Sequence, residues 1–201
     1  MKTEPETPRE KATSRKRELI IEAAVECFIE RGFHQTSIRD IAGAAGISVG
    51  NLYNHFASKS ALILQLAELE LGEFDKFVLI LEIKNDPQKV LAKFVDRFLD
   101  YSANPINAAL MVEFFAEAVR NEDIGEAFMK NRVAVTNALK ELIAQGQKSG
   151  EFVSEIDADQ SPEVILDIIE GFAMRSAQSK KRPDKIARKE LHRIIERYLY
   201  V

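Results

Sequence analysis

With 201 residues, of which 46% are hydrophobic and 30% charged, the chain has the composition of a globular protein, which excludes fibrous and low-complexity classes. The net charge of −4 does not exclude DNA binding, because residues 1–60 carry 9 Lys and Arg against 8 Asp and Glu, and a local basic surface suffices. The single Cys27 excludes an internal disulfide. No secretory signal follows Met1, and the most apolar run, Phe77–Leu81, is too short for a membrane span. We therefore expect a cytoplasmic protein without a membrane partner.

The first predicted helix follows a polar N-terminal segment. Residues 1–13 contain proline and show no periodicity, which predicts a disordered arm. From Ser14 to Arg31 apolar residues recur at helical spacing. Ser14 is placed to cap this helix, and Gly32 is placed to end it.

Two short helices separated by a tight turn are predicted next. Ser37 caps the first, with an acidic residue at its third position in a near capping box. Gly46 ends this helix where the chain must turn sharply. The second opens at Ser48 or Val49 and is expected to run through Phe56.

The rest of the chain also predicts helices. A long helix runs from Lys59 to about Ile83, capped by the preceding serine. Another begins near Glu122 and ends at Gly150, and the last begins near Asp184. Three dipeptides place a capping residue before a proline and mark further helix starts: Asp86-Pro87, Asn104-Pro105 and Ser161-Pro162. No segment alternates with period two, so we expect an all-α protein of about nine helices.

The segment Thr36–Lys59 carries the clearest functional signal. Two short helices across a glycine turn, backed by an apolar first helix, can set the second helix in a DNA major groove. Leu52 and Phe56 are four residues apart and are expected to face the core. On the outward faces, the glycine lets the backbone approach DNA closely and the asparagine amide can hydrogen-bond to a base edge. The tyrosine and the histidine can donate hydrogen bonds to phosphates. These outward residues are Gly50, Asn51, Tyr53 and His55.

The basic residues near this segment can be interpreted in two ways. Lys59 lies in the first turn of its helix, where a cation opposes the helix dipole but helps the helix N-terminus to hold a phosphate. The cluster Arg15–Arg17 is either a phosphate contact or a solvated helix start.

On these residues the chain resembles the TetR family of bacterial repressors, over about Ser14 to Leu66. The resemblance implies a three-helix helix-turn-helix domain over 14–60 and a helical ligand-binding and dimerisation domain over 61–201. It implies a homodimer that binds a pseudo-palindromic double-stranded operator and is released by a small, largely apolar effector. The implied DNA contacts are Arg39, Ser48, Gly50, Asn51, Tyr53, Asn54, His55 and Lys59.

The resemblance places the effector among the apolar residues of the C-terminal helices, with a few polar groups. The expected lining residues are Phe94, Arg97, Phe98, Asn107, Met111, Phe114, Glu117, Asn137 and Phe172, with Glu113 as a further polar candidate. The last two helices resemble the family's dimer interface. The expected contacts there are Val164, Ile168, Phe172, Arg175, Leu191, Ile195 and Tyr198.

Other functional classes remain as alternatives. The three histidines are too scattered for a recognisable metal motif, and no nucleophile elbow or phosphate loop is present, so we expect neither an enzyme nor a bound metal or cofactor. A helical carrier that binds apolar ligands without DNA is the alternative, although it would not need the exposed residues of 39–59. Activator and repressor cannot be separated, and the effector and operator sequence stay open.

Overall fold

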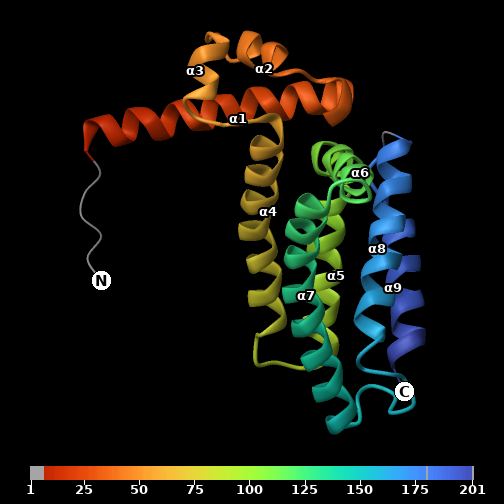
Figure 1. Ribbon diagram of the computed structural model, residues 1–201. Helices are drawn as coiled ribbons and strands as arrows, with labels where there is room; N and C mark the ends of the chain where they lie inside the picture. Colours follow the sequence, from red (N-terminus) through yellow and green to blue (C-terminus); the bar gives the residue numbers. More distant parts are fainter. Residues whose placement is uncertain (1–6, 180, 201) are drawn as a thin grey trace.

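The computed structural model describes residues 7–179 and 181–200 of the chain, and these residues form nine helices (Figure 1). The helices are α1 (Pro8–Gln35), α2 (Ile38–Ala44), α3 (Val49–Tyr53), α4 (Lys59–Leu81), α5 (Pro87–Ser102), α6 (Pro105–Ala118), α7 (Glu122–Ser149), α8 (Ser161–Gln178) and α9 (Lys185–Leu199). The only extended pairing among the described residues is an isolated bridge between Phe152 and Tyr200. The predicted all-α fold is confirmed.

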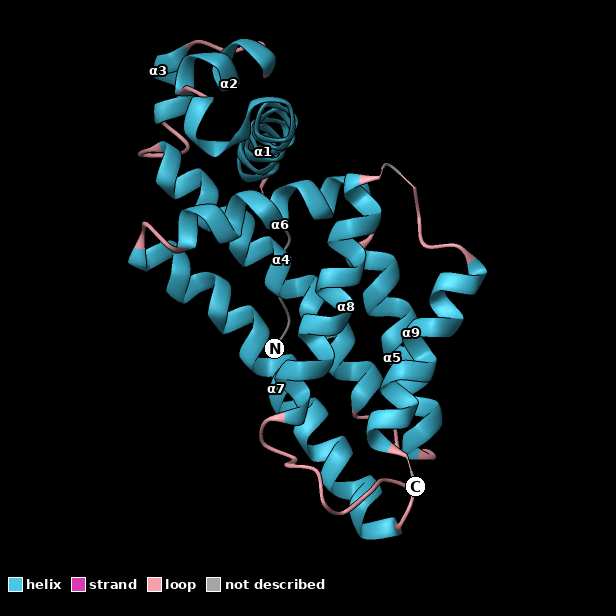
Figure 2. Ribbon diagram, turned by 90° about the vertical axis from the view of Figure 1, so that its right-hand side faces the viewer, coloured by secondary structure: helices cyan, strands magenta, loops and turns pink. Residues whose placement is uncertain are grey.

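The helices divide into a small group at one end and a bundle below it (Figure 1). α1 lies across the end of the bundle, with α2 and α3 on its outer side. α4 runs from this small group down into the bundle, and α6 lies at the end of the bundle that faces α1. α8 and α9 lie side by side along one face of the bundle in both views (Figures 1 and 2). α4 and α6, with the start of α7, therefore join the two groups.

Most of the predicted helix starts are confirmed by their caps. Each capping side chain accepts a hydrogen bond from a backbone N–H of the first turn, as in Ser37, Ser58, Asp86, Asn104 and Asp184. Gly150 ends α7 with a left-handed backbone, as predicted. Ser161 is the exception, because it is the first residue of α8 and its hydroxyl donates to the Asp157 carbonyl at 2.6 Å.

The start of α1 corrects one prediction. The helix begins at Pro8 and not at Ser14, so the disordered arm predicted over 1–13 is wrong for residues 8–13, whereas residues 1–6 lie outside the described part. A proline in the first turn costs no hydrogen bond, because an N–H there has no partner within the helix.

Two hydrophobic clusters form the interior of the part that the structure describes. One lies within the bundle and is rich in phenylalanine, with Phe74, Phe77, Phe94 and Phe98 packed mostly edge to face. The other holds α1, α2, α3 and the first half of α4 together and also takes in Phe114 of α6 and Ile124 of α7. The second cluster therefore crosses from the small group into the bundle.

An ion-pair network fixes α8 against α7. The Arg132 guanidinium of α7 donates to Glu163 at 2.8 Å, to Asp167 at 2.6 Å and to both carboxylate oxygens of Glu170 at 2.7 and 2.8 Å. Burial raises the pKa of Glu170, and the charge of Arg132 opposes that rise. The pairing of the half-buried Arg132 with the buried Glu170 therefore helps to fix α8 against α7.

Candidate DNA-binding surface and ligand cavity

α2 and its turn are built by local hydrogen bonds. The Ser37 hydroxyl accepts from the Asp40 N–H at 3.2 Å, and the Asp40 carboxylate accepts from the Ser37 N–H at 2.9 Å, which confirms a capping box. The hydrogen bonds from Ser37 hold the pKa of Asp40 below its usual value. Gly46 has a φ of 67°, a conformation that glycine adopts without a steric penalty. The turn therefore sets α3 at a fixed angle to α2.

α3 is shorter than predicted. It spans Val49–Tyr53 and does not reach Phe56; Asn54 is its C-cap, and the Asn54 N–H donates to the carbonyls of Gly50 and Asn51. Leu52 and Phe56 are buried in the core, as predicted. The residues after α3 turn back toward the body of the protein.

The predicted DNA contacts gather around α2 and α3. Tyr53 is 52% exposed, and the side chains of Arg39, Ser48 and Asn54 are also exposed, whereas Asn51 and His55 are half-buried. Ser48 accepts a hydrogen bond from the Asn51 N–H at 3.2 Å and so fixes the start of α3. Figure 1 shows α2 and α3 together at the end of the molecule away from the bundle, where a duplex can reach them.

Two basic residues near this surface have partners inside the protein. The Lys59 ammonium donates to the carbonyls of Phe33 at 2.6 Å and of Thr36 at 3.0 Å, and so it holds the loop between α1 and α2. Arg17 donates to the His55 carbonyl at 2.9 Å, and its guanidinium lies 4.3 Å from the centre of the Phe56 ring. Both side chains therefore help to position the segment around α2 and α3 that carries the predicted DNA contacts.

A joint between α1 and α6 was not foreseen. α1 breaks at Gly32, where φ is 79° and ψ is 166°, and the freed Phe33 N–H donates to a Glu113 carboxylate oxygen of α6 at 2.6 Å. The Phe33 ring also meets the Phe114 ring edge to face at 5.2 Å. Glu113, considered from the sequence as a pocket residue, instead accepts a hydrogen bond from the end of α1 that leads into α2. No sequence signal pairs residues 80 positions apart.

A cavity of about 520 Å³ lies between α4, α5 and α6. Its walls are Leu66, Leu69, Glu70, Glu73, Tyr101, Asn107, Leu110 and Phe114. A smaller cavity of about 250 Å³ shares three of these residues, Glu73, Tyr101 and Asn107, and adds Arg97 to the lining. Asn107 is positioned by a hydrogen bond from its amide to the Tyr101 carbonyl at 3.0 Å.

Only part of the predicted ligand pocket meets at this cavity. Asn107, Phe114 and Arg97 line it or its smaller neighbour. Phe94 and Phe98 are fully buried in the bundle core, and Met111 is buried. Glu117 and Phe172 are half-buried, and Asn137 is exposed on α7. Helical spacing identified apolar faces correctly but could not say which of them leave empty space.

Glu70 is the unusual group in this cavity, and no sequence pattern predicts it as a cavity residue. One carboxylate oxygen accepts a hydrogen bond from the Tyr101 hydroxyl at 3.1 Å. The other, Oε2, is buried without a hydrogen-bond partner among the described residues. Burial raises the pKa of Glu70 to about 7, although the Tyr101 hydrogen bond opposes the rise.

The raised pKa of Glu70 predicts how the substitution Glu70→Gln changes the stability of the protein at different pH values. The folded pKa of about 7 lies above the ordinary value, so the wild-type protein loses stability as pH rises toward 7 and stays at the lower level above it. Glutamine does not ionise and should stabilise the protein by about 2 kcal/mol at pH 8, with little gain at pH 4. Chemical denaturation at both pH values measures the difference. An equal gain at the two values would contradict the burial of a charge.

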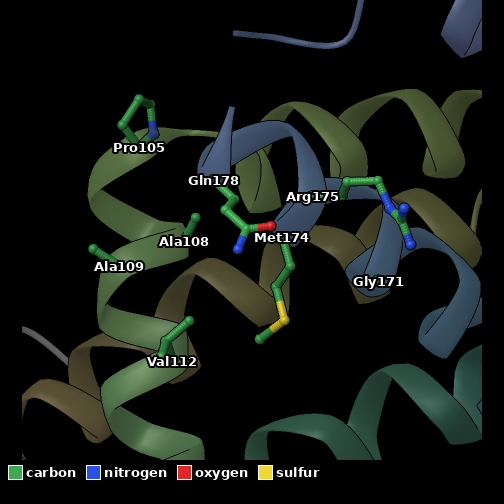
Figure 3. A pocket seen from close by; sticks show the side chains of 8 residues that line it. All are labelled: Pro105, Ala108, Ala109, Val112, Gly171, Met174, Arg175 and Gln178. Carbon is green, nitrogen blue, oxygen red and sulfur yellow. The ribbon is translucent and has the colours of Figure 1, made fainter. Parts of the chain in front are cut away.

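A second, larger groove of about 650 Å³ lies between α6 and α8 (Figure 3). It is lined by Pro105, Ala108, Ala109, Val112, Gly171, Met174, Arg175 and Gln178. The Met174 side chain points between the two helices, whereas Arg175 extends along α8 away from Val112 (Figure 3). The groove adjoins the α8 residues expected at the dimer interface.

The predicted dimer contacts divide between the surface and the interior. Val164 is 40% exposed and Arg175 is exposed on α8, while Ile168, Phe172 and Tyr198 are half-buried. Leu191 and Ile195 are wrong as partner contacts, because both are buried inside the protomer. The apolar stripe of α9 attaches that helix to its own bundle, and Ile194 of the same helix is 51% exposed.

Among the described residues, no helix combines the length and apolar character that a membrane crossing requires. Nor do the His, Cys, Asp and Glu side chains in that part of the chain form a group that could hold a metal ion.

Comparisons with known proteins match the chain along most of its length. Residues 20–66 match the family described as "Bacterial regulatory proteins, tetR family", and residues 87–200 match "BetI-type transcriptional repressor, C-terminal". The HTH-type transcriptional regulator UidR of Escherichia coli (strain K12) is 29% identical over 166 residues, which cover 76% of each chain.

Solved structures give the same fold. FadR from Bacillus subtilis in complex with stearoyl-CoA has a TM-score of 0.75 at 20% identity, covering 91% of this chain and 99% of that one. A regulator from Saccharomonospora viridis in complex with choline has a TM-score of 0.79 at 24% identity, covering 94% and 99%.

Proposed function

The chain belongs to the TetR family of bacterial transcriptional regulators, and on that premise we propose that it represses transcription as a dimer bound to a pseudo-palindromic operator. Family members such as UidR and KstR2 are DNA-binding regulators, and FadR has been solved with a ligand bound, so this protein is a ligand-responsive DNA-binding regulator. The finer proposal is that a small effector in the cavity between α4, α5 and α6 releases the operator in the cytoplasm. It involves no catalytic step.

The observation that carries the DNA-binding proposal is the exposure of α3. Tyr53 is half exposed beside Asn54, while Leu52 behind them is fully buried. A short helix anchored by one apolar residue and turned outward by polar ones fits a major groove. A two-fold dimer would repeat this helix at about one helical turn of DNA.

The effector cavity is proposed for the α4–α5–α6 site and not for the larger α6–α8 groove. The α4–α5–α6 cavity has aromatic walls and an acidic side chain that is largely buried, which can give orientation and specificity. The larger groove includes Gly171 and Arg175, on the α8 face proposed to meet the partner subunit.

Two elements support coupling of the cavity to the DNA-binding surface. α4 carries Glu70 in the cavity and Lys59 on the carbonyls of the α1–α2 loop. α6 carries Phe114 in the cavity wall, packed on Phe33, and the neighbouring Glu113 on the Phe33 N–H. A ligand that favours a different spacing of α4 and α6 would move α1 with them and shift the population away from the DNA-binding arrangement.

The substitution Asn51→Ala tests whether α3 recognises the operator sequence. The substitution should lower affinity for the operator by about tenfold or more, because one amide–base contact is worth about 1–3 kcal/mol. Affinity for random DNA should change little, since that affinity rests on phosphate contacts. Fluorescence anisotropy with an operator selected from a random library measures both at two salt concentrations.

The matched control is Asn137→Ala, an exposed asparagine on α7 far along the chain from the surface tested. If the Asn51→Ala protein bound the operator as tightly as the wild type, α3 would not be the helix that recognises the operator sequence. A selection that returned no preferred sequence would overturn the repressor proposal and favour the carrier. Lys59→Ala is a poor test, because it also releases the carbonyls of Phe33 and Thr36.

A further inference from the structure

The first turns of α1 protrude from the rest of the protein. Figure 1 shows the start of this helix extending past α3 and α4, on the side of the molecule opposite to α8 and α9. The side chains of residues 11–16 are all exposed, and Ile20 is the first residue of α1 in the hydrophobic cluster that holds α1, α2 and α3. A helical segment that buries no apolar face gains little stability from packing, and its whole surface is open to another molecule.

The protruding turns are strongly basic. Residues 11–17 contain four Lys and Arg and no Asp or Glu. One of the four, Arg17, donates to a backbone carbonyl of the protein itself. We name the other three, Lys11, Arg15 and Lys16, the basic extension. None of them forms an ion pair with a side chain that the structure describes, so their charges are left for a partner.

The surface around α2 and α3 offers few cations of its own. Residues 34–60 contain two Lys or Arg, Arg39 and Lys59. Lys59 donates to backbone carbonyls of the loop between α1 and α2, whereas the Arg39 side chain is exposed. Neutralisation of phosphates supplies much of the affinity of DNA-binding proteins. The basic extension adds three cations to the one that Arg39 provides.

Two residues of the basic extension lie on the side of α1 that faces α2. Glu26 and Cys27 of α1 line a groove together with residues of α2. Arg15 and Lys16 precede these two residues by eleven positions, which is close to three helical turns, so they lie on the same face of α1. The acidic residues that follow the basic extension along α1 are Glu18, Glu22, Glu26 and Glu30. A polyanion is therefore attracted to α1 only at its first turns.

We propose that the basic extension binds phosphates of the duplex outside the half-site that α3 contacts. The inference rests on the proposed function in placing α3 in the major groove and the α8 face against the partner subunit. Because α1 starts on the side opposite to α8 and α9, the basic extension of each protomer then points away from the two-fold axis, toward the outer ends of the operator. Phosphate contacts carry no direct sequence information, so the basic extension raises affinity for any duplex that reaches it.

Removing the three charges tests the proposal. The full-length variant with Lys11→Gln, Arg15→Gln and Lys16→Gln keeps good helix formers at exposed positions, and circular dichroism checks its helix content. Fluorescence anisotropy over a range of salt measures its affinity for a random-sequence duplex. Each phosphate contact contributes about 0.9 to the slope of log affinity against log salt concentration, so we expect the slope of the dimer to fall by about two to five. A smaller fall would overturn the proposal.

The matched control removes the same charge from the bundle. Lys84, Lys93 and Lys148 are exposed and form no ion pair with a described side chain. The loop after α4 and the end of α7, which carry two of them, lie at the end of the bundle opposite to α1 (Figure 1). Their replacement by glutamine should change the slope by less than about one, because no phosphate contact is lost. An equal fall in the two triple variants would reflect net charge alone and would contradict a local contact.

The length of the duplex locates the contact. A selected operator is compared as the bare palindrome and with about one helical turn of random sequence added at each end. The added ends should raise wild-type affinity by about tenfold or more and that of the variant lacking the basic extension by less than about threefold. The same gain in both proteins would show that the three residues do not reach the outer ends.

The substitution Asn51→Ala, measured in parallel, separates this inference from the proposed function. Loss of the basic extension should weaken binding to the operator and to random DNA by the same factor, whereas Asn51→Ala should weaken binding to the operator alone. If only the second expectation holds, the outer contact fails and the repressor proposal stands. If the wild type prefers no sequence but loses salt dependence with the basic extension, the phosphate contact stands and the proposed function fails.

Discussion

Replacing Arg132 with methionine is expected to lower the free energy of unfolding by about 3 kcal/mol or more. The Arg132 side chain is 12% exposed and that of its partner Glu170 is 10% exposed, so both charges lie largely out of water. Methionine fills a similar volume but leaves the Glu170 carboxylate without its cation. Removing one member of a buried pair is far costlier than removing the whole pair, because the remaining charge stays buried. Chemical denaturation near neutral pH measures the loss.

Lys140→Met is the matched control on the same helix. Lys140 pairs with Asp159, but the two side chains are largely exposed, so this change should cost less than about 1 kcal/mol. The deficit of Arg132→Met should also shrink in acid, because a protonated Glu170 no longer needs a cation. Equal losses in the two variants, or a deficit independent of pH, would contradict the account. A double variant with Glu170→Leu should recover much of the loss.

Gly32→Ala is expected to cost about 3 kcal/mol and to weaken operator binding. The backbone at Gly32, with φ of 79° and ψ of 166°, lies in a region that is essentially restricted to glycine and costs other residues about 1–3 kcal/mol. An alanine Cβ there would also lie 2.9 Å from both carboxylate oxygens of Glu113. The joint between α1 and α6 would have to open, and the α1–α2 loop would lose its fixed position.

Gly72→Ala gives the opposite expectation. Gly72 lies inside α4, and a Cβ added there would meet nothing within 4 Å, so alanine should stabilise the helix by about 0.5–1 kcal/mol. Glu113→Ala combined with Gly32→Ala should recover the part of the loss due to the clash and not the part due to the backbone. Denaturation and operator anisotropy on the four proteins measure these changes. A Gly32→Ala protein as stable as wild type would refute the account of the joint.

Much of the segment around α2 and α3 was predictable because its signals are local. A serine three residues before an aspartate forms its capping box without help from the rest of the chain, as Ser37 and Asp40 do. Gly46 sets a turn by its own conformational freedom, and the four-residue spacing of Leu52 and Phe56 decides which side of α3 is buried. Each of these features depends on neighbours within one or two helical turns.

The cavity and the interface were predicted less well because they depend on distant neighbours. The apolar residues Leu191 and Ile195 were read correctly as one face of a helix, but periodicity cannot tell whether that face meets its own bundle or a second subunit. Glu70 gives no signal in the sequence, because an acid among apolar residues of a long helix is usually solvated. Its burial arises only when α5 places Tyr101 against it.

The hydrophobic cluster that holds α1, α2 and α3 has a consequence for protein engineering. It includes Leu62, Ile63, Leu66 and Ala67 and reaches Phe114 and Ile124, so a fragment cut after residue 60 would expose much of its own interior. A chimaera that grafts a foreign operator reader onto this bundle should therefore be spliced inside α4, beyond Ala67, and should keep or co-vary the two contacts from α6 and α7. Operator specificity can be exchanged between such proteins only where the hydrophobic residues of the grafted helices pack against those of the recipient's α6 and α7.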